Sequence, residues 1–229
     1  MTVYEMQELC RRTLEYLKAV ISPGMSLKKV RRICEQYMLE NGADSFWYWD
    51  VGAFVFSGKD TVLSVSGKNY QTADSLIQHD DIITIDLSPQ NNNIWGDYAR
   101  TVILENGKVV DNLTEITNEE WRNGIVMEEY LHCSMKNFVT ENTTFEELYY
   151  HINKIIVEKG YMNLDFLGNL GHSIVMDKKD RVYIEKGNAQ KLSSVTAFTF
   201  EPHICRVNGT YGVKMENIYS FENGKLTEK

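Results

Sequence analysis

The chain carries the same order of landmarks twice along its 229 residues, which limits it to folds built from two similar halves. Four pairs of positions keep one order at offsets of 115 to 118 residues: Ser26 and Thr144, Gly42 and Gly160, residues 105–108 and 222–225, and residues 84–86 and 199–201. Coincidence is the alternative, because the Glu-Asn-Gly-Lys sequence of the third pair is a common hairpin turn. We favour a duplicated unit, since the order and the spacing are preserved together.

Two amphipathic helices are predicted at the start of each half. Apolar residues recur at three- and four-residue steps over residues 3–21 and 117–138, which is the period of an α-helix with one buried face. A second helix is expected to begin after Ser26 and after Thr144, because both side chains can cap free backbone N–H groups. Thr144 and Glu147 together form a capping box.

Strand-like sequence follows each helix pair, over residues 46–104 and 172–221. It is rich in aromatic and β-branched residues and is broken by Gly, Asn and Asp. Two such copies predict an α+β fold, in which an antiparallel sheet is covered by helices on one face. We therefore expect one domain over residues 1–229, with an internal repeat of about 3–108 and 117–225.

Composition narrows the classes of function. With 24 basic and 32 acidic side chains the formal net charge is −8, which argues against nucleic acid as a partner. No apolar run approaches the roughly 18 residues of a membrane span, so no membrane partner is expected. The four cysteines form no Cys-x-x-Cys pair, which favours a reduced, cytoplasmic protein.

An acidic residue lies on each arm of a predicted hairpin in the first half. Strand alternation puts Asp86 on one face together with Thr84 and Ser88. If the hairpin is centred on residues 91–92, Asp86 lies directly opposite Asp97. The two Cβ atoms would then be roughly 4.5–5.5 Å apart.

The second half repeats this arrangement with glutamates. Asn208-Gly209 predicts a type I′ hairpin turn, and pairing across it sets Glu201 opposite Glu216. Alternation also puts His203 on the face of Glu201.

Four carboxylates in two opposed pairs need protons or cations to coexist. Four solvent-facing acids on an ordinary sheet are the alternative. Hard oxygen ligands with one imidazole suit a divalent ion such as Mn, Fe, Co or Zn. Carboxylates can bridge, so four of them suffice for two ions about 3.5–4 Å apart. His172, which opens the second strand region, is the candidate imidazole, although a lone histidine is more often structural.

With these five residues the sequence resembles the metallopeptidase family of methionine aminopeptidase, aminopeptidase P, prolidase and creatinase. It is most similar to the prolidase and aminopeptidase P branch. The resemblance covers nearly the whole chain and rests on short motifs at residues 22–26, 41–43, 57–58, 97–101, 171–172 and 200–202, and on Asp86 and Glu216. It implies the pseudo-two-fold pita-bread fold.

The resemblance also implies a centre with two divalent ions, Mn, Co, Fe or Zn. Asp86 would bind one ion, His172 and Glu201 the other, and Asp97 and Glu216 would bridge them. The implied activity is hydrolysis of a small peptide or amide bond through a metal-bridging hydroxide, as in an aminopeptidase or Xaa-Pro dipeptidase. Glu201 would carry a proton to the leaving nitrogen. The partner would be a short peptide or another small molecule, and a homodimer is left open.

The sequence departs from the family at the positions that contact substrate. Active members carry a histidine after the Ser-Gly motif and another past the Gly-His motif. In this chain, residues 59–78 and 175–190 contain no histidine. His203 could replace a missing donor and act in catalysis, or it could be an ordinary sheet-face histidine. The branch's N-terminal domain has no counterpart in residues 1–229.

Two alternatives to a peptidase therefore stay open. One is a metalloenzyme of the same fold that acts on a non-peptide small molecule, either hydrolytically, as creatinase does, or in redox chemistry with iron. The other is a non-catalytic binding module, against which the retention of all five ligands counts.

Overall fold

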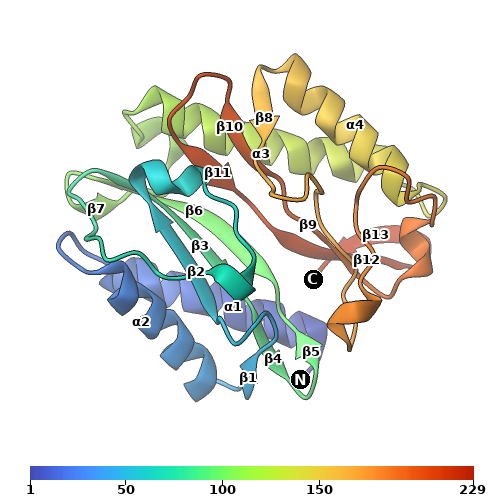
Figure 1. Cartoon of the computed structure of the whole chain (residues 1–229), viewed down its shortest axis with the longest axis horizontal. Coiled ribbons are helices and arrows are strands. Elements are labelled where there is room, and N and C mark those ends of the chain that lie inside the picture. The colour runs from blue at the N-terminus through green and yellow to red at the C-terminus, as the bar shows by residue number, and fades with distance from the viewer.

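Four long helices and thirteen strands form the chain in a computed structural model that describes residues 1–229 (Figure 1). The long helices are α1 (Val3–Val20), α2 (Leu27–Glu40), α3 (Glu119–Phe138) and α4 (Phe145–Glu158). Ser26 caps α2, and Thr144 caps α4 in a capping box with Glu147, as predicted. Helix α3 begins two residues later than expected, because the side chain of Asn118 accepts hydrogen bonds from the backbone N–H groups of Glu120 and Trp121.

The strands pair only in antiparallel fashion, in four small sheets. In the first half they are β1 (Ser45–Phe46), β2 (Ala53–Ser57), β3 (Asp81–Leu87), β4 (Pro89–Asn91), β5 (Ile94–Trp95), β6 (Tyr98–Glu105) and β7 (Lys108–Val109). In the second half they are β8 (Tyr161–Asn163), β9 (Phe198–Phe200), β10 (His203–Arg206), β11 (Gly212–Lys214), β12 (Asn217–Glu222) and β13 (Lys225–Glu228). The sheet orders are β1-β4-β5, β2-β3-β6-β7, β11-β10-β8 and β13-β12-β9.

The helices cover one side of the strands in each half, and a separate apolar core lies beneath each helix pair. Alternating residues of β3, such as Ile83 and Ile85, pack against α1 and α2. Phe198 of β9 and Ile204 of β10 pack against α3 and α4. The opposite face of β3 presents Thr84 and Asp86 to a cavity. The predicted α+β architecture, with antiparallel strands covered by helices on one face, is confirmed.

One strand of the first half joins the second half. Strand β6 lies beside β11 and β12, and Ala99 bridges to Glu216, whose backbone N–H donates to the Ala99 carbonyl at 3.0 Å. Figure 1 shows the two helix pairs on opposite sides of this junction. Each half runs helix, helix, strands in chain order, and the superposition of residues 3–108 on 117–225 stays a prediction.

Strand structure is shorter than the sequence predicts in both halves. Between β2 and β3 the chain forms the 3₁₀ turns Gly58–Val62 and Gly67–Asn69, and between β8 and β9 it forms the 3₁₀ turns Lys178–Asp180 and Leu192–Ser194. His172 therefore lies in an isolated bridge with Tyr183 rather than at the start of a long strand. These segments are rich in Gly, Ser, Asp and Lys, which favour turns over ladders.

The two predicted Glu-Asn-Gly-Lys turns are hairpin turns in the structure. Asn106 and Gly107 join β6 to β7, and Asn223 and Gly224 join β12 to β13, with positive φ at all four residues, as a type I′ turn requires. No helix in the structure is both long and apolar enough to cross a membrane.

Candidate metal centre

Asp86 and Asp97 reach one site from neighbouring positions of the first hairpin. The prediction that they are direct cross-strand partners is wrong, because Asp86 pairs with Ala99. The turn is centred on Asn92 and Asn93, both with positive φ, one residue later than expected. A shift of the centre by one residue moves each partner by two positions, so Asp97 keeps the same face but lies diagonal to Asp86.

The second hairpin has the predicted register but a different turn. His203 pairs with Lys214, and Phe200 pairs with Asn217, so Glu201 and Glu216 fall opposite each other between these two short ladders. The predicted type I′ turn at Asn208-Gly209 is wrong, because only Asn208 has positive φ. The turn instead closes with the Gly209 N–H donating to the Arg206 carbonyl at 2.7 Å, within a longer loop.

Three of the four carboxylates converge closely. One carboxylate oxygen from each of Asp86, Asp97 and Glu216 lies within 4.8 Å of the others. Glu216 is 1% exposed, and neither of its carboxylate oxygens has a hydrogen-bond partner. Asp97 is also buried, and its Oδ2 has no hydrogen-bond partner. Unsatisfied buried carboxylate oxygens of this kind are costly unless a proton or a cation lies between them.

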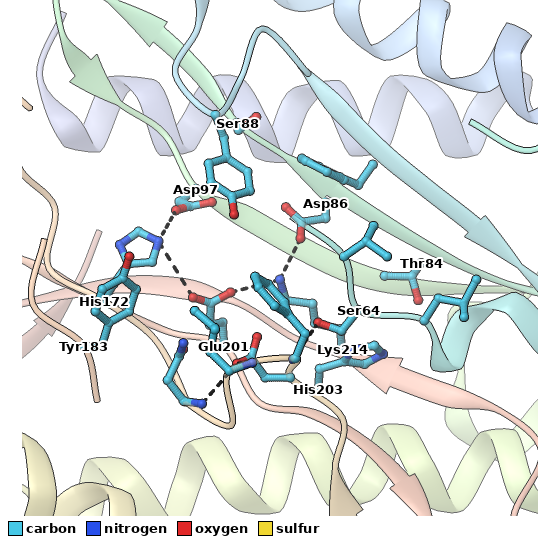
Figure 2. A pocket seen from close by; sticks show the side chains of 18 of the residues that line it. Ser64, Thr84, Asp86, Ser88, Asp97, His172, Tyr183, Glu201, His203 and Lys214 are labelled. Carbon is cyan, nitrogen blue, oxygen red and sulfur yellow. Dashed lines mark hydrogen bonds and ion pairs between the residues drawn. The ribbon is translucent and has the colours of Figure 1, made fainter. Parts of the chain in front are cut away.

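The imidazole of His172 faces the same cluster. Its Nδ1 lies 3.0 Å from the Ser173 carbonyl, which can only accept, so Nδ1 carries a proton. Its Nε2 points at Asp97 Oδ2 (3.3 Å) and Glu201 Oε1 (3.8 Å), as Figure 2 shows. In the neutral tautomer the Nε2 lone pair therefore faces two carboxylate oxygens, an arrangement that calls for a shared cation.

Sequence reasoning missed Lys214, which lies among the carboxylates. Its Nζ is 2.6 Å from Asp86 Oδ2 and 3.0 Å from Glu201 Oε2 (Figure 2). It also lies 3.5 Å from Glu216 Oε2. The signal was present in the sequence, because Lys214 lies two residues before Glu216 and alternation puts both on one face. The residue opposite it in the predicted register is His203.

Burial and mutual repulsion set the protonation of the cluster. Burial raises the pKa of Glu216 well above its usual range, and the charges of Asp97 and Glu201 raise it further. Burial raises the pKa of Asp97 to about 6, although the nearby imidazole of His172 opposes the shift. Burial by itself lowers the pKa of Lys214 and of His172. The surrounding carboxylates outweigh this effect, so the pKa of both groups is raised. The metal-free site thus holds protons where a divalent ion could bind.

His203 lies in the same cavity but makes a structural contact as well. Its Nε2 is 2.7 Å from the Thr61 carbonyl and donates to it. Burial, reinforced by the charge of Lys214, lowers the pKa of His203 to about 4, so the ring is neutral at pH 7 and Nδ1 is its acceptor. A role for His203 in catalysis stays a prediction.

Asp86, Asp97 and Glu201 line a cavity of about 110 Å³ whose wall combines polar and apolar side chains. Trp47 and Tyr48 line it, and Trp47 stacks on Trp95 at 4.3 Å between ring centroids. The two segments without the family's histidines also line it, with Leu63, Ser64 and Val65 from one and Arg181 from the other. The departures noted in the sequence therefore lie at the cavity wall.

The donor set fits a divalent cation. Asp97 Oδ2 lies 3.3 Å from His172 Nε2, and ligand atoms of Asp86, Asp97 and Glu216 lie within 4.8 Å of one another. Asp97, Glu216 and His172 are buried. Carboxylate oxygens with one imidazole match the preferences of Mn, Fe, Co or Zn.

Comparison with known proteins agrees with this geometry. The model of metallopeptidase family M24 matches residues 3–222. The chain belongs to metallopeptidase family M24. The family resemblance inferred from its motifs is thereby confirmed. No curated protein is significantly similar in sequence.

Solved structures of this family have the same fold as the chain. The prolidase from Pyrococcus furiosus superposes with a TM-score of 0.81 at 20% identity, over 99% of this chain and 61% of that one. The X-Pro aminopeptidase from Thermotoga maritima MSB8 gives a TM-score of 0.80 at 19% identity, over 99% of this chain and 59% of that one. The Xaa-Pro dipeptidase from Bacillus anthracis gives a TM-score of 0.78 at 19% identity, over 98% of this chain and 58% of that one. The chain thus spans about three fifths of the length of these proteins.

Proposed function

We propose that the protein is a divalent-metal-dependent hydrolase that cleaves a small peptide or amide bond. The observation that carries the proposal is the cluster of Asp86, Asp97 and Glu216, whose ligand atoms lie within 4.8 Å of one another, with His172 Nε2 at 3.3 Å from Asp97 Oδ2. Asp86, Asp97 and His172 line a cavity. Glu201 completes the proposed ligand set. Membership of metallopeptidase family M24, and the peptidases with the same fold, support this chemistry.

A divalent ion held by these donors would supply a nucleophilic water near neutral pH and polarise the carbonyl of the scissile bond. Glu201 is the proposed proton carrier. Although burial opposes ionisation, Lys214 and His172 lower its pKa, so Glu201 is a carboxylate that can accept a proton from water. It would then deliver this proton to the leaving nitrogen. Thr199, whose hydroxyl donates to Glu201 Oε1 at 3.2 Å, orients the carboxylate.

The size of the cavity supports a short substrate. A volume of about 110 Å³ admits one or two residues of a peptide, while the apolar wall of Trp47, Leu63 and Val65 favours an apolar side chain. His203 Nδ1 is the remaining neutral acceptor on the wall and is proposed to contact the substrate. The resemblance predicts two ions bridged by Asp97 and Glu216. Nζ of Lys214, however, already forms ion pairs with three of the proposed ligands, Asp86, Glu201 and Glu216.

The proposal is tested by incubating chelator-stripped protein with Met-, Ala- and Xaa-Pro dipeptides, with and without added Mn or Co. We expect hydrolysis of at least one dipeptide that depends on metal and falls by at least about a hundredfold in Glu201→Gln. The exposed Glu185→Gln variant is the matched control and should retain full activity. Metal binding without turnover of any dipeptide would contradict peptide hydrolysis.

A second candidate, hydrolysis of a non-peptide small molecule, is favoured by the cavity wall. The wall presents Leu63, Ser64 and Val65 where active peptidases of the family carry a substrate histidine. A panel of small amides and guanidino compounds, assayed with the same metals and the same Glu201→Gln control, separates this candidate from a peptidase.

A further inference from the structure

We infer that the ammonium group of Lys214 takes the position of one of the two cations, so that the centre binds a single divalent ion. The inference deepens the proposed function and rests on it, because it concerns the same carboxylates.

The contacts of Lys214 are those of a cation bound by carboxylates. Its Nζ lies 2.6 Å from Asp86 and 3.0 Å from Glu201, and its side chain is 13% exposed. Glu216, at 3.5 Å, is the third carboxylate on the same nitrogen. Three acidic side chains around one nitrogen are more than an ordinary ion pair requires, and they match the oxygen-rich surroundings of a metal ion.

The oxygens of the shared glutamates divide into two groups. Glu201 turns Oε2 to Lys214 and Oε1 to His172, at 3.0 Å and 3.8 Å. Glu216 Oε2 lies 3.5 Å from Lys214 Nζ, and neither oxygen of Glu216 has a hydrogen-bond partner. Asp86 faces Lys214, and Asp97 faces His172. The side chains thus form two cation positions that share Glu201 and Glu216, and one of the two already contains an ammonium group.

A divalent ion and the ammonium group cannot use the first position together. An oxygen of Asp86 lies within 4.8 Å of ligand atoms of Asp97 and Glu216, but an ion at the first position would have to bind this carboxylate at about 2.0–2.2 Å while Nζ stays 2.6 Å from its Oδ2. Two cations so close in a buried site repel each other strongly. One divalent ion and one ammonium group together carry three positive charges. They offset three of the four negative charges that Asp86, Asp97, Glu201 and Glu216 carry when all are ionised.

The backbone of Lys214 holds the side chain in this position. Its N–H donates to Thr101 Oγ1 at 2.9 Å, and its carbonyl accepts from the same hydroxyl at 3.3 Å. Pairing with His203 in β10 fixes the strand from the other side. The second position, formed by His172, Asp97 and the Oε1 atoms of Glu201 and Glu216, is therefore the one available to a metal ion.

The test counts the metal ions bound to the protein of residues 1–229. Chelator-stripped wild type, Lys214→Met, Lys214→Arg and the exposed control Lys179→Met are each saturated with Mn(II), desalted, and analysed by elemental analysis and electron paramagnetic resonance. We expect one tightly bound Mn(II) per chain, with the spectrum of an isolated ion, in wild type, Lys214→Arg and Lys179→Met. In Lys214→Met we expect two ions per chain and the spectrum of an exchange-coupled pair.

Wild type that binds two Mn(II) ions, or none, would overturn the inference, and so would a folded Lys214→Met variant that still binds one. If Lys214→Met does not fold, the count in wild type decides alone. The outcome is separate from that of the proposed function: metal-dependent hydrolysis with two ions refutes only the inference, whereas one ion without hydrolysis of any substrate refutes only the function.

Discussion

The Nε2 atom of His172 lies 3.3 Å from Oδ2 of Asp97, although the two residues are 75 positions apart in the chain. Ser173 fixes the other nitrogen of the ring, so only Nε2 can face the carboxylate. In the metal-free protein the carboxylates raise the pKa of His172 against the effect of burial, which favours a proton on Nε2. A metal ion must displace that proton in order to bind.

The first prediction follows from this competition. Burial raises the pKa of Asp97 to about 6, and the pKa of His172 is also above its ordinary value, so both are protonated at pH 5 and lose protons as the pH rises. We expect the apparent affinity for Mn(II) to increase by at least about tenfold from pH 5.5 to pH 7.5, with proton release on binding. Titration calorimetry in two buffers of different ionisation enthalpy measures both. An affinity that is constant over this range would show that neither group is a ligand.

The second prediction concerns Glu216, whose two oxygens are buried without partners. Glu216→Gln should abolish the metal-dependent gain in melting temperature, because a central ligand is lost. The metal-free variant should be as stable as metal-free wild type, or more stable by about 1–3 kcal/mol, because burial raises the pKa of Glu216 and the glutamine removes the cost of protonating this carboxyl group on folding. Thermal unfolding with and without Mn(II) measures both effects. The exposed Glu158→Gln should keep the metal-dependent gain, and a metal-free Glu216→Gln that unfolds much more easily would make Glu216 a structural residue.

The third prediction tests the backbone that orients His172. Gly171 has φ of +143°, and a Cβ atom there would lie 2.2 Å from the Thr199 carbonyl oxygen. Gly171→Ala should therefore prevent folding or reduce Mn(II) affinity by more than about tenfold, because the strand at Thr199 must move. Gly187 is the matched control, with φ of +85° and no atom within 4 Å of a Cβ. Gly187→Ala should cost only about 1 kcal/mol and leave metal affinity unchanged; equal effects of the two would refute the role of close packing.

The fourth prediction concerns Glu128 on α3, which is 1% exposed and has no partner for either carboxylate oxygen. Burial raises its pKa well above the usual range, so the folded protein keeps a proton that the unfolded chain releases above about pH 4.3. Wild type should thus lose stability relative to Glu128→Gln as the pH rises from 4 to 8, by about 1–3 kcal/mol. Denaturant unfolding at several pH values measures this difference. The Glu129→Gln variant, at an exposed neighbouring position, should show the same change in stability with pH as wild type.

The fifth prediction treats residues 1–229 as one cooperative unit. Ala99 of β6 bridges to Glu216, and Lys214 joins Asp86 of the first half to Glu201 of the second. We expect a single calorimetric transition whose enthalpy equals the van't Hoff value. Two transitions, one for each half, would show that the halves fold independently and would contradict the single domain.

Local sequence rules determined most of the secondary structure and the identity of the converging acids. The capping box at Thr144 and the turns at Asn106-Gly107 and Asn223-Gly224 depend on neighbouring residues only, so they could be read directly. Alternation put Asp86 and Glu201 on the correct faces even where the turn was wrong. A shift of a hairpin centre moves partners by two positions and preserves the face, so the assignment survived the error.

Tertiary structure alone decided what lies between those acids. No local rule sets the distance from His172 to Asp97, because it depends on how the loop before β9 packs against β6. The same is true of Lys214. Strand alternation puts it on the face of Glu216, but its three carboxylate partners come from β3, from the end of β9 and from the start of β12. Electrostatic interactions in a buried site act through space rather than along the chain, so the balance between a bound metal and a resident ammonium group is fixed only when the two halves meet.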